Sequence, residues 1–221
     1  MTLSFATLDW DKIWEATYET FYMTLIALTG TFILGLLLGL LLYLTAKEGL
    51  WENKAIYFVT ATVVNVFRAI PFIILILLLF PFTHFLVGTI RGPNAALPAL
   101  IIGAAPFYGR LVEIALKEID KGVIEAAQSM GATTRSIIFK VLLPESMPAL
   151  ISGLTVTAIA LIGYTAMAGA IGAGGLGSYA YYAGFQRRAF DVVFICSVII
   201  VLIVFIFQFI GDFISRKIDK R

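Results

Sequence analysis

The sequence offers few side chains that could carry out catalysis. His84 is its single histidine, and no serine lies near it in the sequence that it could activate as a nucleophile. Cys196 is the single cysteine, which excludes an internal disulfide, and it lies in an apolar run that favours a packed thiol over a reactive one. We therefore expect His84 to be a surface residue and the chain not to be an enzyme.

The sequence predicts no nucleotide site, although one stretch matches a nucleotide-binding pattern. Gly172 to Gly177 satisfies G-x-G-x-x-G, and Asp191 follows at about the distance of a ribose partner. The run follows an apolar helix rather than a short strand, however, so close packing of helices or an external gate explains the glycines better. The phosphate-binding pattern G-x-x-x-x-G-K-[S/T] is absent from the sequence. We expect no cofactor to be bound by this chain, which has no recognisable means of hydrolysing ATP by itself.

The composition is typical of an integral membrane protein. Apolar residues make up 60% of the chain, charged residues 14%, and the mean hydropathy is +0.96, whereas soluble domains carry about 25% charged residues. The net charge of +2 is too small to suggest nucleic acid as a partner. Long uncharged intervals predict an all-α membrane protein with five transmembrane helices at about 20–45, 56–80, 94–115, 149–171 and 192–213.

The distribution of basic residues predicts the orientation. Lys and Arg are concentrated in the segments 47–54, 110–145 and 212–221, whereas the segments expected on the opposite side of the membrane hold only Lys12, Arg91, Arg187 and Arg188. By the positive-inside rule the N-terminus is expected outside and the C-terminus in the cytoplasm. The interval 146–186 then holds one span, and the glycine- and tyrosine-rich segment 172–186 is an external loop or a re-entrant segment.

The predicted cytoplasmic loop over 117–147 is longer than a turn between neighbouring helices requires. Its apolar residues recur at steps of three and four, which places them on one face of a short helix. These are Ile119, Val123, Ala126, Ala127 and Met130. Gly131 allows a bend, Thr133 or Thr134 caps a second helix, and Pro144 is expected to end it. Such a unit is either an amphipathic hairpin on the membrane surface or a knob inserted into a partner's groove.

Within this loop the sequence resembles the EAA motif of ABC importer membrane subunits. Glu125-Ala126-Ala127 is followed after three residues by Gly131, and after nine more by Val141, one residue, then Leu143-Pro144. Every spacing matches, and Val141 replaces the usual isoleucine. The resemblance implies the type I ABC importer permease fold as a single domain over 1–221. It also implies that residues 125–130 form a coupling helix that seats in a separate ATPase subunit, and that Gly131 lets this helix turn away.

Over nearly its whole length the chain is similar to permeases of methionine importers. The runs that carry this resemblance are 65–73 (NVFRAIPFI), 103–107 (GAAPF) and 163–167 (GYTAM) leading into 169–177. The resemblance implies a homodimer in the bacterial inner membrane with two ATP-binding cassette subunits that use ATP and Mg²⁺. It further implies an external methionine-binding lipoprotein and transport of D- and L-methionine. Another small amino acid or a related solute remains an alternative substrate, and an ion-coupled secondary transporter is the alternative from another class.

Arg68, Tyr164 and Met167 are candidates for a gate or a pathway residue. Arg68 is the only clear charge in the middle of a predicted span, where a charge is costly. It either reaches the interface, pairs with a carboxylate such as Glu113, or lines the pathway. Tyr164 and Met167, near the outer end of the fourth span, either pack against apolar neighbours or narrow the path in both copies of a dimer.

Overall fold

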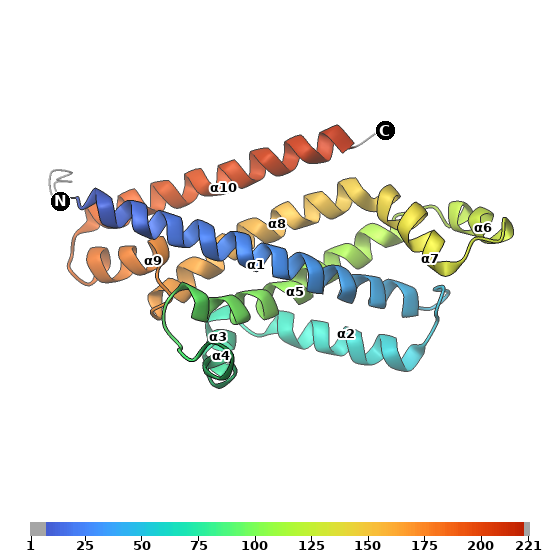
Figure 1. Cartoon of the computed structure of the whole chain (residues 1–221), viewed down its shortest axis with the longest axis horizontal. Helices are drawn as coiled ribbons and strands as arrows, with labels where there is room; N and C mark the ends of the chain where they lie inside the picture. The colour runs from blue at the N-terminus through green and yellow to red at the C-terminus, as the bar shows by residue number, and fades with distance from the viewer. Residues whose placement is uncertain (1–7, 219–221) are drawn as a thin grey trace.

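The computed structural model describes residues 8–218, which fold into helices joined by short connections (Figure 1). The helices in chain order are α1 (Trp10–Thr45), α2 (Lys54–Ala69), α3 (Phe72–Leu78), α4 (Phe80–Val87), α5 (Pro93–Lys117), α6 (Lys121–Ser129), α7 (Thr134–Ile137), α8 (Leu143–Ala170), α9 (Gly175–Tyr179) and α10 (Phe190–Ile218). Two π-helical segments, η2 (Ile138–Leu142) and η3 (Ala180–Phe185), follow α7 and α9.

Four uninterrupted helical stretches are long and apolar enough to cross a membrane, namely α1, α5, the run Thr134–Ala170 and α10. The pair α2 and α3 passes the same test together but is bent by 108°. By length and composition, residues 8–218 therefore supply four candidate spans, or five if the bent pair is one. The chain is an all-helical membrane protein.

The sharp bend falls inside the segment 56–80, for which the sequence predicted one span. Ile70 has an extended conformation at ψ 122°, and Pro71 lacks the N–H that would continue the helical ladder. The chain restarts as α3, so Arg68 lies in the last turn of α2 rather than in the middle of a straight helix.

Small residues bring α1 and α5 together along the centre of the bundle. A Cβ atom on Gly35 would lie 2.9 Å from the Ala105 carbonyl oxygen, and one on Gly39 would lie 2.6 Å from the Gly109 carbonyl oxygen. Such distances leave no room for a side chain, which is how small residues allow close helix packing in membranes. By contrast α10 is mostly exposed and presents large apolar side chains such as Phe209, as expected of a lipid-facing helix.

The prediction that Pro144 ends a helix was wrong. α7, η2 and α8 form one helical run from Thr134 to Ala170, and Pro144 lies within the first two residues of α8. The Leu143 N–H bonds the Ile138 carbonyl, five residues back, so the turn before the proline is wider than an α-turn. We attribute the continuation to this widening, because it relieves the clash between a proline ring and the preceding turn.

The two ends of the bundle carry different elements (Figure 1). α6, α7, the connection between α1 and α2 and the C-terminal end of α10 lie at one end. The start of α1 and α9 lie at the other end. The segments that the sequence marked as basic, including 47–54 and 110–145, thus gather around one end of the molecule.

Candidate functional site

The segment predicted to couple to an ATPase begins with α6, a nine-residue helix. The Asp120 side chain caps it by accepting a hydrogen bond of 2.7 Å from the Gly122 N–H. Ala127 is buried against the bundle end, whereas Met130 is 82% exposed and Glu125 is exposed. One side of α6 therefore packs against the end of the bundle, and the opposite side is exposed.

The expected single apolar face of this segment is divided. Ile119 and Ala127 are buried, but Val123, Ala126 and Met130 are exposed. The helix starts only at Lys121, so Ile119 lies before it and does not share its periodicity. The exposed apolar residues around Glu125 form a surface that the bundle itself does not cover, which is what a docking helix requires.

The bend after α6 has the geometry that the sequence predicted. Gly131 has φ 79°, and the Ala132 N–H bonds the Ala127 carbonyl at 3.0 Å across the helix end. A Cβ on Gly131 would meet nothing within 4 Å, so backbone conformation rather than space makes glycine the suitable residue. Thr133 caps α7 by accepting a 3.3 Å hydrogen bond from the Ser136 N–H.

The second half of the motif packs inward. Val141 and Leu143 are half-buried against the apolar cluster that also holds Ala127, while Pro144 is exposed at the start of α8. The motif residues therefore fall into two groups. Ala127, Val141 and Leu143 hold the two arms of the loop together, and Glu125 and Ala126 remain on the surface.

An ion pair ties α6 to the connection between α1 and α2. Lys121 Nζ lies 2.6 Å from Glu48 Oε2, which lowers the pKa of Glu48 and raises that of Lys121. Both side chains are exposed, so the pair positions α6 more than it stabilises the fold. Both residues line a pocket of about 550 Å³, whose lining also includes Lys47, Glu125 and Gln128.

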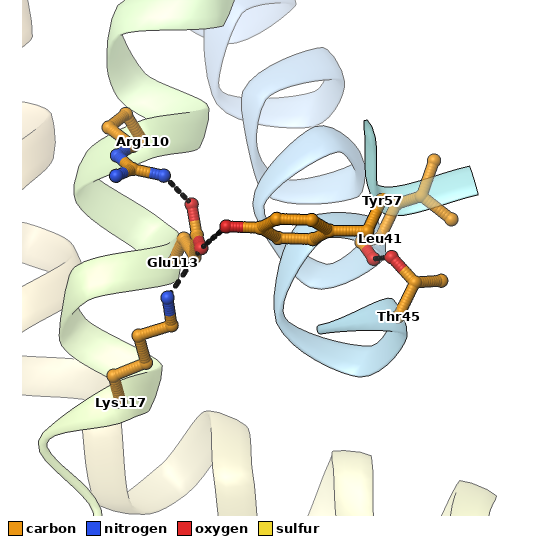
Figure 2. Close-up of polar contacts among 6 residues, drawn as sticks. All are labelled: Leu41, Thr45, Tyr57, Arg110, Glu113 and Lys117. Atoms are coloured by element: carbon orange, nitrogen blue, oxygen red, sulfur yellow. Dashed lines mark hydrogen bonds and ion pairs between the residues drawn. The ribbon is translucent and has the colours of Figure 1, made fainter. Parts of the chain in front are cut away.

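A cluster around a buried carboxylate lies near the C-terminal end of α5, the end that leads to α6 (Figure 2). Glu113 is fully buried and accepts hydrogen bonds from Arg110 at 2.5 Å and Lys117 at 2.7 Å. The Tyr57 hydroxyl of α2 donates a longer bond of 3.4 Å. The pairing of Arg68 with Glu113 considered from the sequence was therefore wrong. The spacing of Arg110 and Lys117, three before and four after Glu113, was the sequence signal that could have identified these partners.

Two of the three gate or pathway candidates, Arg68 and Tyr164, line the same pocket. The Tyr164 ring stacks on Phe72 with centroids 4.4 Å apart, and both line a pocket with Arg68. Met167 is 48% exposed, so it is not enclosed within this chain.

The glycine-rich run 172–177 packs helices together and is not a phosphate loop. Glu19 of α1 accepts a 2.6 Å hydrogen bond from the Gly175 N–H, and Thr20 accepts one of 2.9 Å from the Leu176 N–H. A Cβ on Gly177 would overlap the Ala166 carbonyl of α8. The prediction of close backbone approach is confirmed. Cys196 is buried and His84 exposed, also as predicted.

Comparison with known proteins identifies relatives over nearly the full chain. The model of the family described as binding-protein-dependent transport system inner membrane component matches residues 32–221. The methionine import system permease protein MetP of Bacillus subtilis (strain 168) is 67% identical over 217 residues, which cover 98% of each chain. The probable D-methionine transport system permease protein MetI of Pasteurella multocida (strain Pm70) is 46% identical, over 96% of this chain and 98% of that protein.

A solved structure of the MetNI methionine ABC transporter in an inward-facing conformation, the CY5 native crystal form, is also similar. It superposes with a TM-score of 0.94 at 43% identity, over 96% of this chain and 98% of that chain.

Proposed function

Because this chain belongs to the family of binding-protein-dependent transport system inner membrane components, we propose that it is the permease subunit of an ABC importer that carries methionine across the bacterial inner membrane. The observation that carries the proposal is 67% identity over 98% of the chain to a methionine import permease. The chain is a non-catalytic, multi-pass transport subunit, so its contribution is a pathway and a mechanical connection to the ATPase.

The partners follow from the family and from the related transporter. An importer of this family depends on a binding protein, and an ABC transporter on an ATPase. The finer assembly is a homodimer of this chain with two ATP-binding cassette subunits and an external methionine-binding lipoprotein. In this arrangement ATP and Mg²⁺ are used by the ATPase subunits, and lipid surrounds exposed helices such as α10.

The coupling residues have distinct roles in this proposal. Glu125 and Ala126 touch the ATPase subunit, because they are exposed on α6. Gly131 sets the angle of α6 by its left-handed conformation. Ala127, Val141 and Leu143 join α6 to the long helix that runs to Ala170, and Pro144 lies in the first turn of α8, so movement of α6 is passed on to α8.

In the proposed topology the chain crosses the membrane five times, with the N-terminus outside and the C-terminus in the cytoplasm. The basic segments around α6 and the C-terminal end of α10 lie at one end of the bundle, and the positive-inside rule places that end in the cytoplasm (Figure 1). The bent pair of α2 and α3 then counts as one interrupted span, with its irregular backbone lining the pathway. Tyr164 and Met167 form the gate toward its outer end.

The proposal is tested by reconstituting the chain with its ATPase and binding protein in proteoliposomes and measuring ATP-dependent uptake of labelled L-methionine, D-methionine and a second small amino acid. Methionine uptake that requires ATP is expected. Uptake of the other amino acid alone would replace the substrate, and uptake driven by an ion gradient without ATP would reject the importer class.

A further inference from the structure

A small pocket lies where α2 breaks and α3 begins. Its volume is about 260 Å³, below the ~300–1,000 Å³ typical of sites for drug-sized ligands, so it suits a small solute. Phe67, Arg68, Ile70 and Phe72 of the run 65–73 line it together with Gly103 and Phe107 of α5. Tyr164 of α8 completes one wall. The three sequence runs 65–73, 103–107 and 163–167 thus meet at one place.

Arg68 gives this pocket an unbalanced positive charge. No hydrogen bond or ion pair joins the Arg68 side chain to any other residue within 8–218, and no carboxylate is among the pocket-lining residues. Glu113, the partner suggested by the sequence, is occupied by Arg110 and Lys117. Arg68 lies about 21 Å along α2 from Lys54, far enough from the helix start to place its charge at membrane depth. A charge there is retained where it faces a watery path or binds an anion.

Apart from Arg68, the residues that line the pocket are apolar or aromatic. Phe72 and Tyr164 are stacked almost parallel, with ring planes 5° apart. A Cβ on Gly103 would lie 3.2 Å from the Phe72 ring, so this glycine lets the ring lie against α5. Aromatic rings are favourable neighbours of a thioether or other apolar side chain. The pocket therefore pairs an anion-binding group with a surface for an apolar side chain.

We propose that this pocket is a substrate subsite within the permease, where Arg68 binds the α-carboxylate of the transported amino acid and the Phe72–Tyr164 pair contacts its side chain. This inference rests on the proposed function and deepens it by assigning a role to the permease in recognising the carboxylate. A guanidinium binds a carboxylate through two parallel hydrogen bonds, so lysine is only a partial replacement.

The test compares binding of L-methionine and methioninol, in which CH₂OH replaces the carboxylate. The chain is purified with its ATPase subunit but without the binding protein, and tritiated L-methionine is displaced by either compound. In the wild type, methioninol is expected to bind about tenfold or more weakly than methionine. In Arg68→Gln the two compounds are expected to bind equally, because the group that distinguishes them has been removed. Arg68→Lys should restore part of the discrimination, and Arg216→Gln, an exposed arginine on α10, should retain all of it.

The ratio of the two affinities separates recognition from a structural effect. A general loosening of the pocket would weaken both compounds together and leave their ratio unchanged. Undiminished discrimination in Arg68→Gln, or no methionine binding by the wild-type assembly, would overturn the subsite. ATP-dependent methionine uptake by the complete wild-type importer, measured in parallel, shows whether the proposed function stands when the subsite fails.

Discussion

Replacing Glu113 with glutamine keeps the shape of the side chain but removes the charge that Arg110 and Lys117 share (Figure 2). Breaking a fully buried ion pair costs about 3–5 kcal/mol. Here the cationic side chains are 36% and 47% exposed, so they can turn toward water after the change. We therefore expect a loss of about 1.5–3 kcal/mol, the range for hydrogen bonds to charged groups. For a chain of this size the melting temperature should fall by roughly 3–12 °C.

The assay is thermal unfolding of the purified chain in detergent, followed by size-exclusion chromatography of the heated samples. Glu118→Gln is the matched control, because Glu118 is exposed, and surface changes usually alter stability by less than about 0.5 kcal/mol. Tyr57→Phe should have a small effect, since its bond to Glu113 is 3.4 Å long. A Glu113→Gln variant that melts within about 1 °C of the wild type would refute this reasoning about the cluster.

Three further predictions concern the ion pair that holds α6, the close packing of α9 and the proposed gate. Because its pair with Lys121 lowers the pKa of Glu48, the ion pair is fully present above the unfolded pKa, near 4.5, and is lost as the pH falls through the folded pKa. Amide hydrogen exchange in α6 should therefore become faster as the pH falls through the folded pKa. Glu48→Gln should abolish this pH dependence. Gly177→Ala should destabilise the chain by about 1–3 kcal/mol in the same thermal assay, because the added Cβ would overlap α8. Gly163→Ala should not destabilise it, because a Cβ at Gly163 meets nothing within 4 Å. Equal melting temperatures of the two variants would contradict the close packing of α9. Met167→Ala should raise the basal ATPase activity of the assembled complex if Met167 forms the gate, and unchanged coupling would remove it from that role.

The sequence predicted features that depend on local chemistry. Long uncharged intervals predicted long apolar helices because lipid cannot satisfy an open backbone. Gly131 and Thr133 were placed correctly because a left-handed helix end and a side-chain cap depend only on neighbouring residues. Close packing at the glycine run was also foreseen, although its partner Glu19, over 150 positions away, was not.

Features set by tertiary contacts were missed. The effect of Pro144 depended on the π-turn before it, and that turn has no clear sequence signal. The division of α6 into buried and exposed apolar residues follows from where the bundle lies against it, which periodicity alone does not give. The size of the bend at Pro71 was likewise not predictable, since proline breaks the ladder without fixing the angle. The partners of Glu113 are Arg110 and Lys117, which are close to it in sequence, whereas the sequence analysis suggested Arg68.

The most direct test of the account measures ATPase activity of the chain assembled with its ATPase and binding protein, with and without methionine, in wild type, Gly131→Asn and Gly131→Val. Asparagine tolerates the left-handed conformation of Gly131, whereas a β-branched residue does not. We predict that methionine stimulates the wild type and the asparagine variant, and that stimulation collapses in the valine variant although the complex still assembles. Full stimulation of the valine variant, or a wild-type complex that hydrolyses ATP without responding to methionine, would contradict the account.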